Sequence, residues 1–395
     1  MATAPPPSAS ASASDPWLTV DGNRLRLLDT GPLRLEALLR LIDGATDSLR
    51  ILYYIYEDDD AGRQVREALF EAHHRGVAVS LIVDGFGSDH AADNDFFTPL
   101  EDAGIAVCRF IPRFGRRYLL RNHQKLALAD GQRVIVGGFN VSDDYFGTPA
   151  DQAWRDLGLL VEGPAVAQLA GYFDALSAWS RTPKPKLRDL AAALEGWSGS
   201  AGPVRWLLGG PMRRLSPWAR AVKRDMRRAR RIDMIAAYFA PNPAMLTRLD
   251  RIGRRGKARI VTAAKSDNTA TIAAARFTYA GLVRKGVQIF EYQHTKLHTK
   301  LFVIDNAVYI GSANFDMRSL YLNLELMLRI EDRAFADQMR AYVDGEIETS
   351  DRVDAAWIKA RGGPITRAKW AFAYFLVAVL DFNVTRRLNF RIAEH

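Results

Sequence analysis

A histidine and a lysine, His298 and Lys300, are the residues of this chain best suited to phosphorus chemistry. They lie two positions apart, so an extended backbone projects both side chains from one face. The apolar run 301–304 predicts a buried strand that anchors them. A second short strand follows and ends in Gly311-Ser312, a tight exit where backbone can approach an anion. An imidazole beside an ammonium, with Asn314 close by, indicates nucleophilic attack on a phosphorus centre.

The same spacing, His-x-Lys with Asp five residues after the lysine, occurs twice in the chain. The two copies are His123, Lys125 and Asp130 in the first half and His298, Lys300 and Asp305 in the second. Each is followed by another apolar run and then by a Gly-x-x-Asn turn, residues 137–140 and 311–314. One such match can arise by chance in a chain of this size. Two matches with the same sequel indicate a duplicated unit that carries chemistry.

Composition limits the classes of protein that fit. The 395 residues, 48% of them hydrophobic, suffice for two packed domains or one duplicated unit. A formal net charge of +9 indicates an anionic binding partner, either nucleic acid or an anionic membrane surface. A basic face exposed to solvent would give the same net charge. The single cysteine, Cys108, excludes a disulfide framework and fits a reducing compartment.

Strand-like and helix-like segments alternate in the same order in both halves, which predicts an α/β fold with parallel or mixed sheets. The first half has strands at 23–28, 49–56 and 77–83, with helices at 33–45 and through 63–72. The second half has strands at 232–238 and 258–262, with helices through 246–249 and at 271–282. We expect a first domain at 21–182, a linker at 183–203 with a short helix at 187–194, and a second domain at 204–360.

The ends of the chain differ from its middle. Residues 1–20 begin with an Ala/Pro/Ser tract that lacks the basic and apolar regions of a signal peptide, so we expect a disordered tail. No apolar run is long enough to span a bilayer, so hydropathy argues against an integral membrane protein. The segment 361–395 is basic and aromatic. Within it, 370–380 fits an interfacial helix on anionic lipid and equally a core helix of the second half.

A basic loop with interleaved aromatic residues, 112–120, precedes the first motif. It could steer a phosphate headgroup into the site or be a solvated loop. Asp267 is similarly open to two interpretations, since a loop could bring it to the site or it could cap a helix.

Paired motifs of this kind in a duplicated α/β chain resemble the phospholipase D superfamily. Flanking segments narrow the resemblance to the bacterial cardiolipin synthase branch, over residues 25–330. The flanks that carry it are Ser312–Ser319 with Asn323 and Glu325, Tyr238–Pro241, Asp58–Arg63 and Arg155–Pro164. The resemblance implies an internally duplicated phospholipase D-like fold, with two mixed β-sheets flanked by helices and one active site between the halves. Some members carry a pair of N-terminal membrane helices, and this chain resembles the short forms without them.

The resemblance also implies a two-step reaction. One histidine forms a covalent phosphohistidine, and the other protonates the leaving alkoxide and then deprotonates the incoming alcohol. The family favours His123 as the nucleophile and His298 as the acid/base, whereas the sequence alone is nearly symmetric. Charge building on phosphorus is expected to be stabilised by Lys125, Lys300, Asn140, Asn314 and the hydroxyl of Ser312. No cluster with metal-ligand spacing accompanies the histidines, so we expect neither a metal nor another cofactor.

Four carboxylates have expected roles. Each histidine needs a carboxylate to fix its tautomer, and the best candidates are Glu325, downstream of His298, and Asp156, downstream of His123. Surface salt bridges are the alternative for both. The last residues of the two motifs, Asp130 and Asp305, are catalytic by family pattern but begin turns, so we expect them to be structural and to hold the two halves together.

Phosphatidyl transfer between two phosphatidylglycerol molecules, giving cardiolipin and glycerol, is the leading hypothesis for function. Hydrolysis to phosphatidic acid uses the same residues, and a phosphodiesterase acting on nucleic acid would also suit the positive charge. The single-chain duplication and the cardiolipin-synthase-like flanks weigh against nucleic acid, and two complete motifs weigh against an inactive membrane-binding protein. We expect anionic phospholipid as the partner, at the cytoplasmic face of a bacterial inner membrane. The acceptor alcohol and the oligomeric state stay open.

Overall fold

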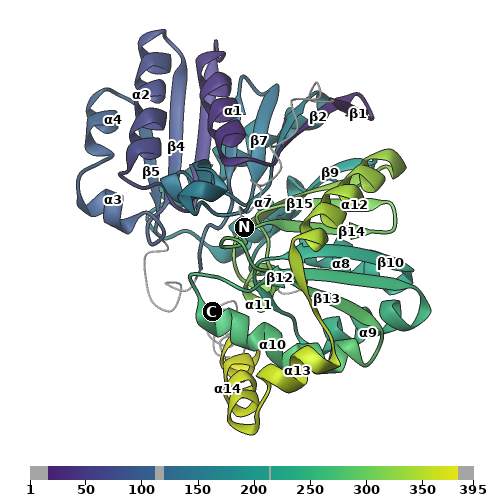
Figure 1. Ribbon diagram of the computed structural model, residues 1–395. Coiled ribbons are helices and arrows are strands. Elements are labelled where there is room, and N and C mark those ends of the chain that lie inside the picture. Colours follow the sequence, from purple (N-terminus) through teal and green to yellow (C-terminus); the bar gives the residue numbers. More distant parts are fainter. Residues whose placement is uncertain (1–16, 112–119, 213–214, 381–395) are drawn as a thin grey trace, which may run out of the picture.

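Two β-sheets packed face to face form the centre of the molecule (Figure 1). The computed structural model describes residues 17–111, 120–212 and 215–380. The first sheet has eight strands in the order β1-β2-β8-β7-β6-β3-β4-β5. Its strands are β1 (Leu18–Val20), β2 (Asn23–Leu28), β3 (Ser48–Tyr53), β4 (Ala78–Asp84), β5 (Ala106–Phe110), β6 (Leu126–Ala129), β7 (Arg133–Gly137) and β8 (Gly158–Glu162).

The second sheet also has eight strands, in the order β18-β13-β12-β10-β14-β15-β17-β9. Its strands are β9 (Val204–Gly209), β10 (Arg231–Ala236), β12 (Lys257–Ala263), β13 (Val287–Tyr292), β14 (Lys300–Ile304), β15 (Ala307–Gly311), β17 (Glu325–Glu331) and β18 (Ser350–Val353). A separate two-stranded pair joins β11 (Phe239–Ala240) to β16 (Phe315–Asp316).

The two sheets are copies of one arrangement. The order β2-β8-β7-β6-β3-β4-β5 corresponds strand by strand to β9-β17-β15-β14-β10-β12-β13, with β1 and β18 added at edges. In both copies three neighbouring strands are parallel, β3-β4-β5 and β10-β12-β13, and the other pairs are antiparallel. The duplicated α/β fold with mixed sheets, predicted from the sequence, is confirmed.

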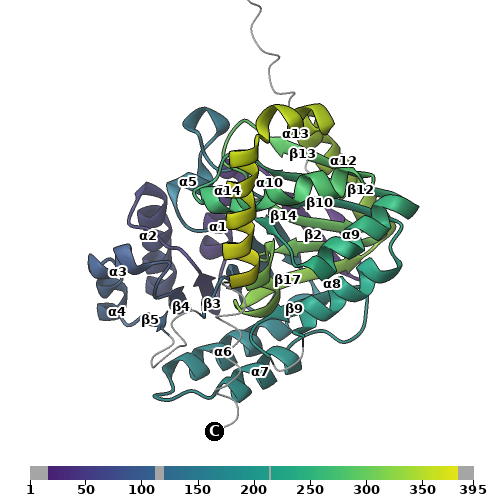
Figure 2. The same cartoon turned by 90° about the horizontal axis from the view of Figure 1, so that it is seen from below.

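Helices flank both sheets, some on the outer faces and some against the core between the sheets. Those of the first half are α1 (Gly31–Asp43), α2 (Asp60–His74), α3 (Asp89–Asp93), α4 (Thr98–Asp102), α5 (Asp143–Phe146) and α6 (Gln168–Arg181). The remainder are α7 (Leu187–Gly196), α8 (Pro217–Arg228), α9 (Pro243–Arg255), α10 (Thr269–Val283), α11 (Met317–Tyr321), α12 (Arg333–Glu348), α13 (Ala355–Arg361), α14 (Pro364–Tyr374) and the π-helical turn η4 (Phe375–Leu380). Helices α1 and α2 pack on the outer face of the first sheet, and α8, α9 and α10 pack on that of the second (Figures 1 and 2).

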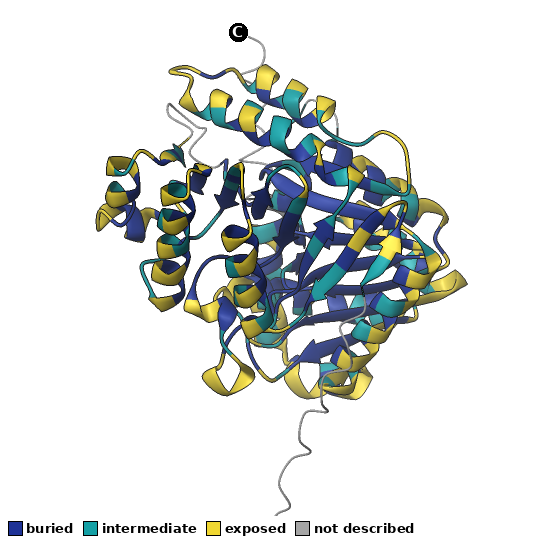
Figure 3. Ribbon diagram, turned by 90° about the horizontal axis from the view of Figure 1, so that it is seen from above, coloured by how far each residue is buried: buried dark blue, intermediate teal, exposed yellow. Residues whose placement is uncertain are grey.

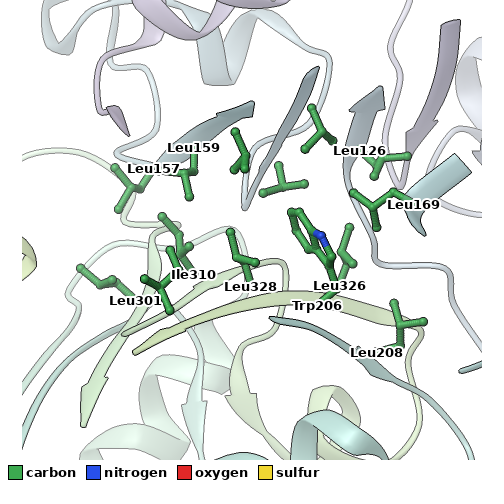
Figure 4. Packing of buried hydrophobic residues seen from close by; sticks show 14 of the residues in the cluster. Leu126, Leu157, Leu159, Leu169, Trp206, Leu208, Leu301, Ile310, Leu326 and Leu328 are labelled. Carbon is green, nitrogen blue, oxygen red and sulfur yellow. The ribbon is translucent and has the colours of Figure 1, made fainter. Parts of the chain in front are cut away.

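The apolar core between the sheets holds the halves together. Leu126 and Leu159 of the first sheet point toward Trp206, Ile310 and Leu328 of the second (Figure 4). Strands in both sheets are mostly buried, whereas the helices alternate between buried and exposed residues (Figure 3). Strands covered on both faces need continuous apolar runs, which explains why the sequence shows such runs rather than strict alternation.

Local sequence explains where the elements begin and end, as α2 illustrates. Asp59 caps it by accepting a hydrogen bond from the Gly62 N–H at 2.8 Å. Val65 and Leu69, four residues apart, form its buried stripe. The chain leaves the helix through Gly76 at φ 91°, a conformation that glycine adopts at little cost.

Three boundary predictions are changed or extended by the structure. Within the tail predicted at 1–20, Leu18–Val20 is ordered and pairs with β2 as strand β1, while residues 1–16 lie outside the described part of the chain. The helix predicted at 187–194 is confirmed as α7, and Leu190 and Leu194 are fully buried against the core, so the predicted linker is a packed segment. The predicted loop at 112–120 lies outside the described residues except for Leu120.

Asp130 and Asp305 occupy equivalent turns at the ends of β6 and β14. Both have left-handed backbone conformations, with φ of 55° and 48°. The Asp130 carboxylate accepts hydrogen bonds from the N–H groups of Thr46, Asp47 and Ser48, at 2.9 to 3.3 Å. Asp305 accepts from Arg230 and Arg231 in the same way. Each therefore ties a turn to the start of a strand within its own half, and the prediction that they hold the halves together is wrong.

We expect Asp130→Asn to lower the free energy of unfolding by about 1 kcal/mol, because charge-assisted hydrogen bonds to three backbone N–H groups weaken. Partial burial raises the pKa of Asp130, but the hydrogen bonds from Ser48, Asp47 and Thr46 outweigh it and lower the pKa below its usual value. This stabilisation is therefore present at neutral pH and is lost as the pH falls through the carboxyl's pKa.

Thermal unfolding of the variant beside Asp102→Asn, an exposed aspartate on α4, measures this effect. Turnover per folded molecule should stay unchanged at both positions. A large loss of turnover without loss of stability at Asp130 would contradict the structural role.

Candidate active site

The two histidines lie where the ends of the two sheets meet. His123 precedes β6 and His298 precedes β14, the central strands of the two copies. Each histidine is fastened by backbone hydrogen bonds to the opposite half. The His123 N–H donates to the Leu324 carbonyl at 3.0 Å, and the His298 N–H donates to the Arg155 carbonyl at 2.7 Å. The residues after these partners are Glu325 and Asp156, so the same contacts carry a carboxylate to each histidine.

The carboxylate–imidazole pairs cross between the halves. His123 Nδ1 lies 3.1 Å from Glu325 Oε2, and His298 Nδ1 lies 2.6 Å from Asp156 Oδ2. Sequence order associates Glu325 with His298 and Asp156 with His123, whereas the fold exchanges them. Both carboxylates are fully buried. Because Nδ1 of each ring faces a carboxylate, Nε2 is the ring nitrogen left for chemistry in the pocket that both histidines line.

Charges in the pairs are set by burial and by close neighbours. Burial and Lys125 lower the pKa of His123, and burial and Lys300 lower that of His298 to about 3. Burial raises the pKa of Asp156, but His298 and Lys300 outweigh it and bring the pKa below its usual value, as His123 does for Glu325. Near neutral pH each pair is therefore a carboxylate that accepts the Nδ1–H of a neutral imidazole.

The two lysines lie beneath the histidines. Lys125 Nζ donates to the His123 carbonyl at 2.7 Å, and Lys300 Nζ donates to the His298 carbonyl. Each side chain is 1% exposed, and neither is part of the pocket lining. Burial lowers the pKa of Lys125 to about 7 and that of Lys300 to about 8. The lysines thus place positive charge behind the reacting groups, and the amount of this charge depends on pH.

The halves differ at the residue after the first glycine of each turn. Ser312 donates its hydroxyl hydrogen to Glu325 and accepts the Leu326 N–H at 3.0 Å. Its hydroxyl is thereby committed to positioning Glu325, away from the place beside substrate oxygens expected from the sequence. The equivalent residue, Gly138, has no room for a side chain, since a Cβ there would lie 2.5 Å from Asp156 Oδ1. The two histidines therefore have equivalent carboxylate partners, but a side-chain hydroxyl from this turn positions only one of those carboxylates, Glu325.

A pocket of about 560 Å³ opens onto both imidazoles. The predicted residues His123, His298, Asn140 and Asn314 all line it. Asn140 is fixed, since its Oδ1 accepts the Ile55 N–H at 3.1 Å and its Nδ2 donates to Tyr145 Oη at 2.9 Å. Asp130 and Asp305 stand at the far ends of β6 and β14, away from this pocket.

Aromatic rings that the motifs did not indicate surround the histidines. Tyr54 lies 5.1 Å from His123, and Tyr145, Trp154 and Tyr238 lie 5.2, 5.3 and 6.2 Å from His298, between ring centroids. Tyr54 and Tyr238 follow the equivalent strands β3 and β10, but they are one position out of step when the repeats are aligned, so the alignment alone would not have paired them. No comparable sequence signal marks Trp154.

Other polar residues complete the lining. They are Arg121, Asp267, Asn268, Thr271, Asp316, Arg318 and Asn323. Asp267 accepts the Tyr238 hydroxyl hydrogen and reaches the pocket, while Asn268 is the residue that caps α10. The helix-cap interpretation of Asp267 is therefore wrong. In the described part of the chain, no three His, Cys, Asp or Glu side chains are grouped to hold a metal ion.

Two opposed neutral imidazoles over buried ammonium groups suit displacement at a phosphodiester. One Nε2 can attack phosphorus while the other ring manages the proton of the leaving oxygen. The carboxylate behind each ring stabilises the positive charge that the ring acquires.

We expect Gly138→Ala to reduce phosphodiester turnover about 100-fold, because the methyl group would displace Asp156 and misorient His298. Its Cβ would also lie 2.9 Å from Lys300 Cδ. Gly345→Ala on α12 is the matched control, since an added Cβ there meets nothing within 4 Å. The Nδ1–H proton resonance of His298 should be lost in the first variant and kept in the second. Unchanged resonance and turnover in Gly138→Ala would contradict the crossed geometry.

Comparison of the sequence with known proteins identifies its relatives. A family model described as "Cardiolipin synthase, PLD-like domain" matches residues 38–177 and 222–346. The chain is 30% identical over 341 residues to cardiolipin synthase A of Pseudomonas entomophila, a match covering 84% of this chain and 70% of that protein. It is 32% identical over 332 residues to cardiolipin synthase A of Pseudomonas fluorescens, covering 82% and 68%.

Solved structures share the fold. A phosphatidylserine synthase from Haemophilus influenzae superposes with a TM-score of 0.70 at 11% identity, covering 92% of this chain and 95% of that one. A polyphosphate kinase from Porphyromonas gingivalis gives 0.55 at 13% identity, covering 82% and 50%. These similarities place the fold, and the family model and the relatives together establish that this chain belongs to the cardiolipin synthase family of phospholipase D-like proteins.

Proposed function

We propose that the protein is a phosphatidyltransferase that moves a phosphatidyl group between phosphatidylglycerol molecules. The observation that carries the proposal is the pair of neutral imidazoles, each held by a carboxylate from the other half, at one pocket. The relatives named cardiolipin synthase A support the lipid substrate. Hydrolysis to phosphatidic acid needs the same groups and is the outcome that the experiment below distinguishes.

In the first step, His123 Nε2 attacks the phosphorus of one phosphatidylglycerol. A P–N bond forms and the P–O bond to the headgroup glycerol breaks, while His298 gives its proton to the leaving alkoxide. Glu325 offsets the positive charge on the phosphorylated ring. His298 must be protonated for this step, and the bound phosphodiester favours that state because an adjacent anion raises the pKa of an imidazole.

In the second step, the hydroxyl of another phosphatidylglycerol replaces the glycerol. His298 takes the hydroxyl proton, the oxygen attacks phosphorus, and the P–N bond breaks to regenerate His123. The products are cardiolipin and glycerol. Asn140 and Asn314, which line the pocket, bind phosphoryl oxygens in this proposal, and Lys125 and Lys300 stabilise the charge on phosphorus from behind.

The proposed setting is the surface of a bacterial inner membrane, on its cytoplasmic side. Both named relatives are bacterial, and the single buried cysteine suits a reducing compartment. None of the helices in the described ranges combines the length and hydropathy of a transmembrane span. Anionic phospholipid is accordingly the proposed partner, and no cofactor is part of the proposed reaction.

Incubation with phosphatidylglycerol vesicles, followed by lipid mass spectrometry, tests the function. We expect cardiolipin and glycerol from the wild-type protein, and a loss of about 10²–10⁴-fold in His123→Ala and in His298→Ala. With the first variant no phosphatidyl-enzyme should form. The second should accumulate it from a substrate with a good leaving group, because only acid/base help is missing.

The products separate the alternatives. Phosphatidic acid as the sole product would mean a hydrolase. Cleavage of single-stranded DNA without lipid turnover would overturn the lipid assignment. Accumulation of the covalent intermediate in His123→Ala rather than His298→Ala would reverse the roles of the two histidines.

The pH dependence of kcat/KM should report the lysines of the unoccupied site. Because the pKa values of Lys125 and Lys300 are lowered to about 7 and about 8, both lose positive charge as the pH rises through this range. A phosphodiester anion then binds less well, so kcat/KM should fall on the alkaline side, while kcat falls at higher pH because bound substrate raises both pKa values.

Lys125→Arg tests this assignment, since a guanidinium stays protonated throughout the range. Its alkaline limb should move up toward the pKa of Lys300. A kcat/KM that is flat between about pH 6 and 9 in the wild-type protein would contradict the lysine electrostatics.

A further inference from the structure

Helix α14 and the turn η4 present an apolar stripe to solvent. Ile365, Phe372, Phe375 and Leu376 are 75%, 62%, 46% and 38% exposed. Their spacing of seven, three and one residues places them on one side of a helix. Exposed apolar side chains grouped in this way mark a contact surface, whereas scattered ones do not. This segment lies beyond residue 346, where the family match ends.

The opposite side of the same helix is packed and fixed. Trp370 and Tyr374 are buried, and Tyr374 Oη donates to the Pro241 carbonyl at 2.8 Å. Figure 2 shows α14 lying across the front of α10, against which it packs. The stripe is therefore held outward by a well-packed inner face. One side of residues 370–380 belongs to the core, as one interpretation predicted, and contact of the outward side with lipid stays a prediction.

The stripe leads directly to the mouth of the catalytic pocket. Leu376 belongs both to the stripe and to the pocket lining. Phe86, from the first half, lines the same pocket and is 59% exposed. The Arg121 guanidinium lies 4.1 Å from the Phe86 ring centroid, and Arg318 is a further lining residue. Exposed apolar side chains and cations thus line the same pocket.

We propose that α14, η4 and Phe86 dock the mouth of the pocket onto the surface of an anionic lipid bilayer. The apolar stripe enters the boundary between headgroups and acyl chains, and Arg121 and Arg318 lie at the level of the lipid phosphates. A substrate lipid then moves from bilayer to pocket along Leu376 and Phe86 without crossing water. The proposal rests on the proposed function for the identity of the lipid, and on the surface itself for docking.

A basic cluster elsewhere on the chain supplies a control. Arg251 and Arg254 are exposed near the end of α9. That end adjoins β12, whose first N–H, of Lys257, donates to the Arg230 carbonyl beside the Asp305 turn. Asp305 is at the end of β14 opposite His298, so these arginines stand far from the mouth. If positive charge alone attracted the membrane, they would contribute as much as the mouth does.

Partitioning onto sucrose-loaded vesicles tests the docking surface. The vesicles contain phosphatidylcholine and phosphatidylglycerol in a ratio of about 3:1, and the buffer has about physiological ionic strength. We expect Phe372→Gln/Phe375→Gln to bind at least about tenfold more weakly, because two exposed aromatic side chains no longer leave water. Arg251→Gln/Arg254→Gln should bind within about twofold of wild type, since charges beyond a screening length contribute little. Gln is a good helix former, so both double variants should keep the circular dichroism spectrum of the wild-type protein.

A dye reports the position of the helix independently of binding strength. Cys108 is buried and is the chain's single cysteine, so an environment-sensitive fluorophore can be directed to Phe372→Cys or to Arg254→Cys. On vesicles, emission at the first position should shift to the blue, and emission at the second should not. Wild-type partitioning by the Phe double variant, or a blue shift confined to position 254, would overturn the proposal.

Substrate presentation separates docking from chemistry. Neither Phe372 nor Phe375 lines the pocket, so the double variant should turn over dispersed short-chain phosphatidylglycerol at the wild-type rate while losing turnover on vesicles. Equal loss on both forms would overturn docking as the role of the stripe. If the wild-type protein turns over neither form, the proposed function fails, and the partitioning and dye measurements still decide the docking surface.

Discussion

Two buried carboxylates, exchanged between the halves of the chain, are the constraint on which the rest of the structure depends. A carboxylate buried without enough partners costs several kcal/mol, and Glu325 and Asp156 each have an imidazole partner only while the two halves stay docked. That requirement fixes how the two sheets dock. The sheets are held in this relative position by the backbone hydrogen bonds to Leu324 and Arg155. The leucine-rich core between the sheets stabilises the same arrangement.

Repetition made most of the fold readable from the sequence. Each His-x-Lys motif marked the start of a central strand, and the apolar run after it predicted the next strand along the chain, β7 or β15, although the order of strands within the sheets was not predicted. Local signals of this kind act within a few residues, through side-chain alternation, helix caps and turns. They predicted α7 and the duplicated sheets, but gave no sign that residues 18–20 add an edge strand, because a three-residue strand is specified by its partner more than by itself.

The site was less predictable than the fold, for a physical reason. Spacing within a strand shows that His123 and Lys125 share a face, but it cannot show which carboxylate meets His123, since that depends on how two separately specified sheets approach each other. The crossing of Glu325 and Asp156, the commitment of Ser312 to Glu325 and the placement of Trp154 beside His298 all follow from that approach. The prediction that Asp130 and Asp305 hold the halves together was wrong because each stabilises a turn within its own half. A residue of a motif can be required by the backbone structure alone.

The exchange also limits how the two repeats can change over generations. In many duplicated chains one copy keeps the activity while the other drifts into a scaffold. Here the partners are 202 and 142 residues apart and belong to opposite copies, so losing a carboxylate in one repeat disables the histidine of the other. Each repeat therefore needs the other for its activity, and the two are kept or lost together.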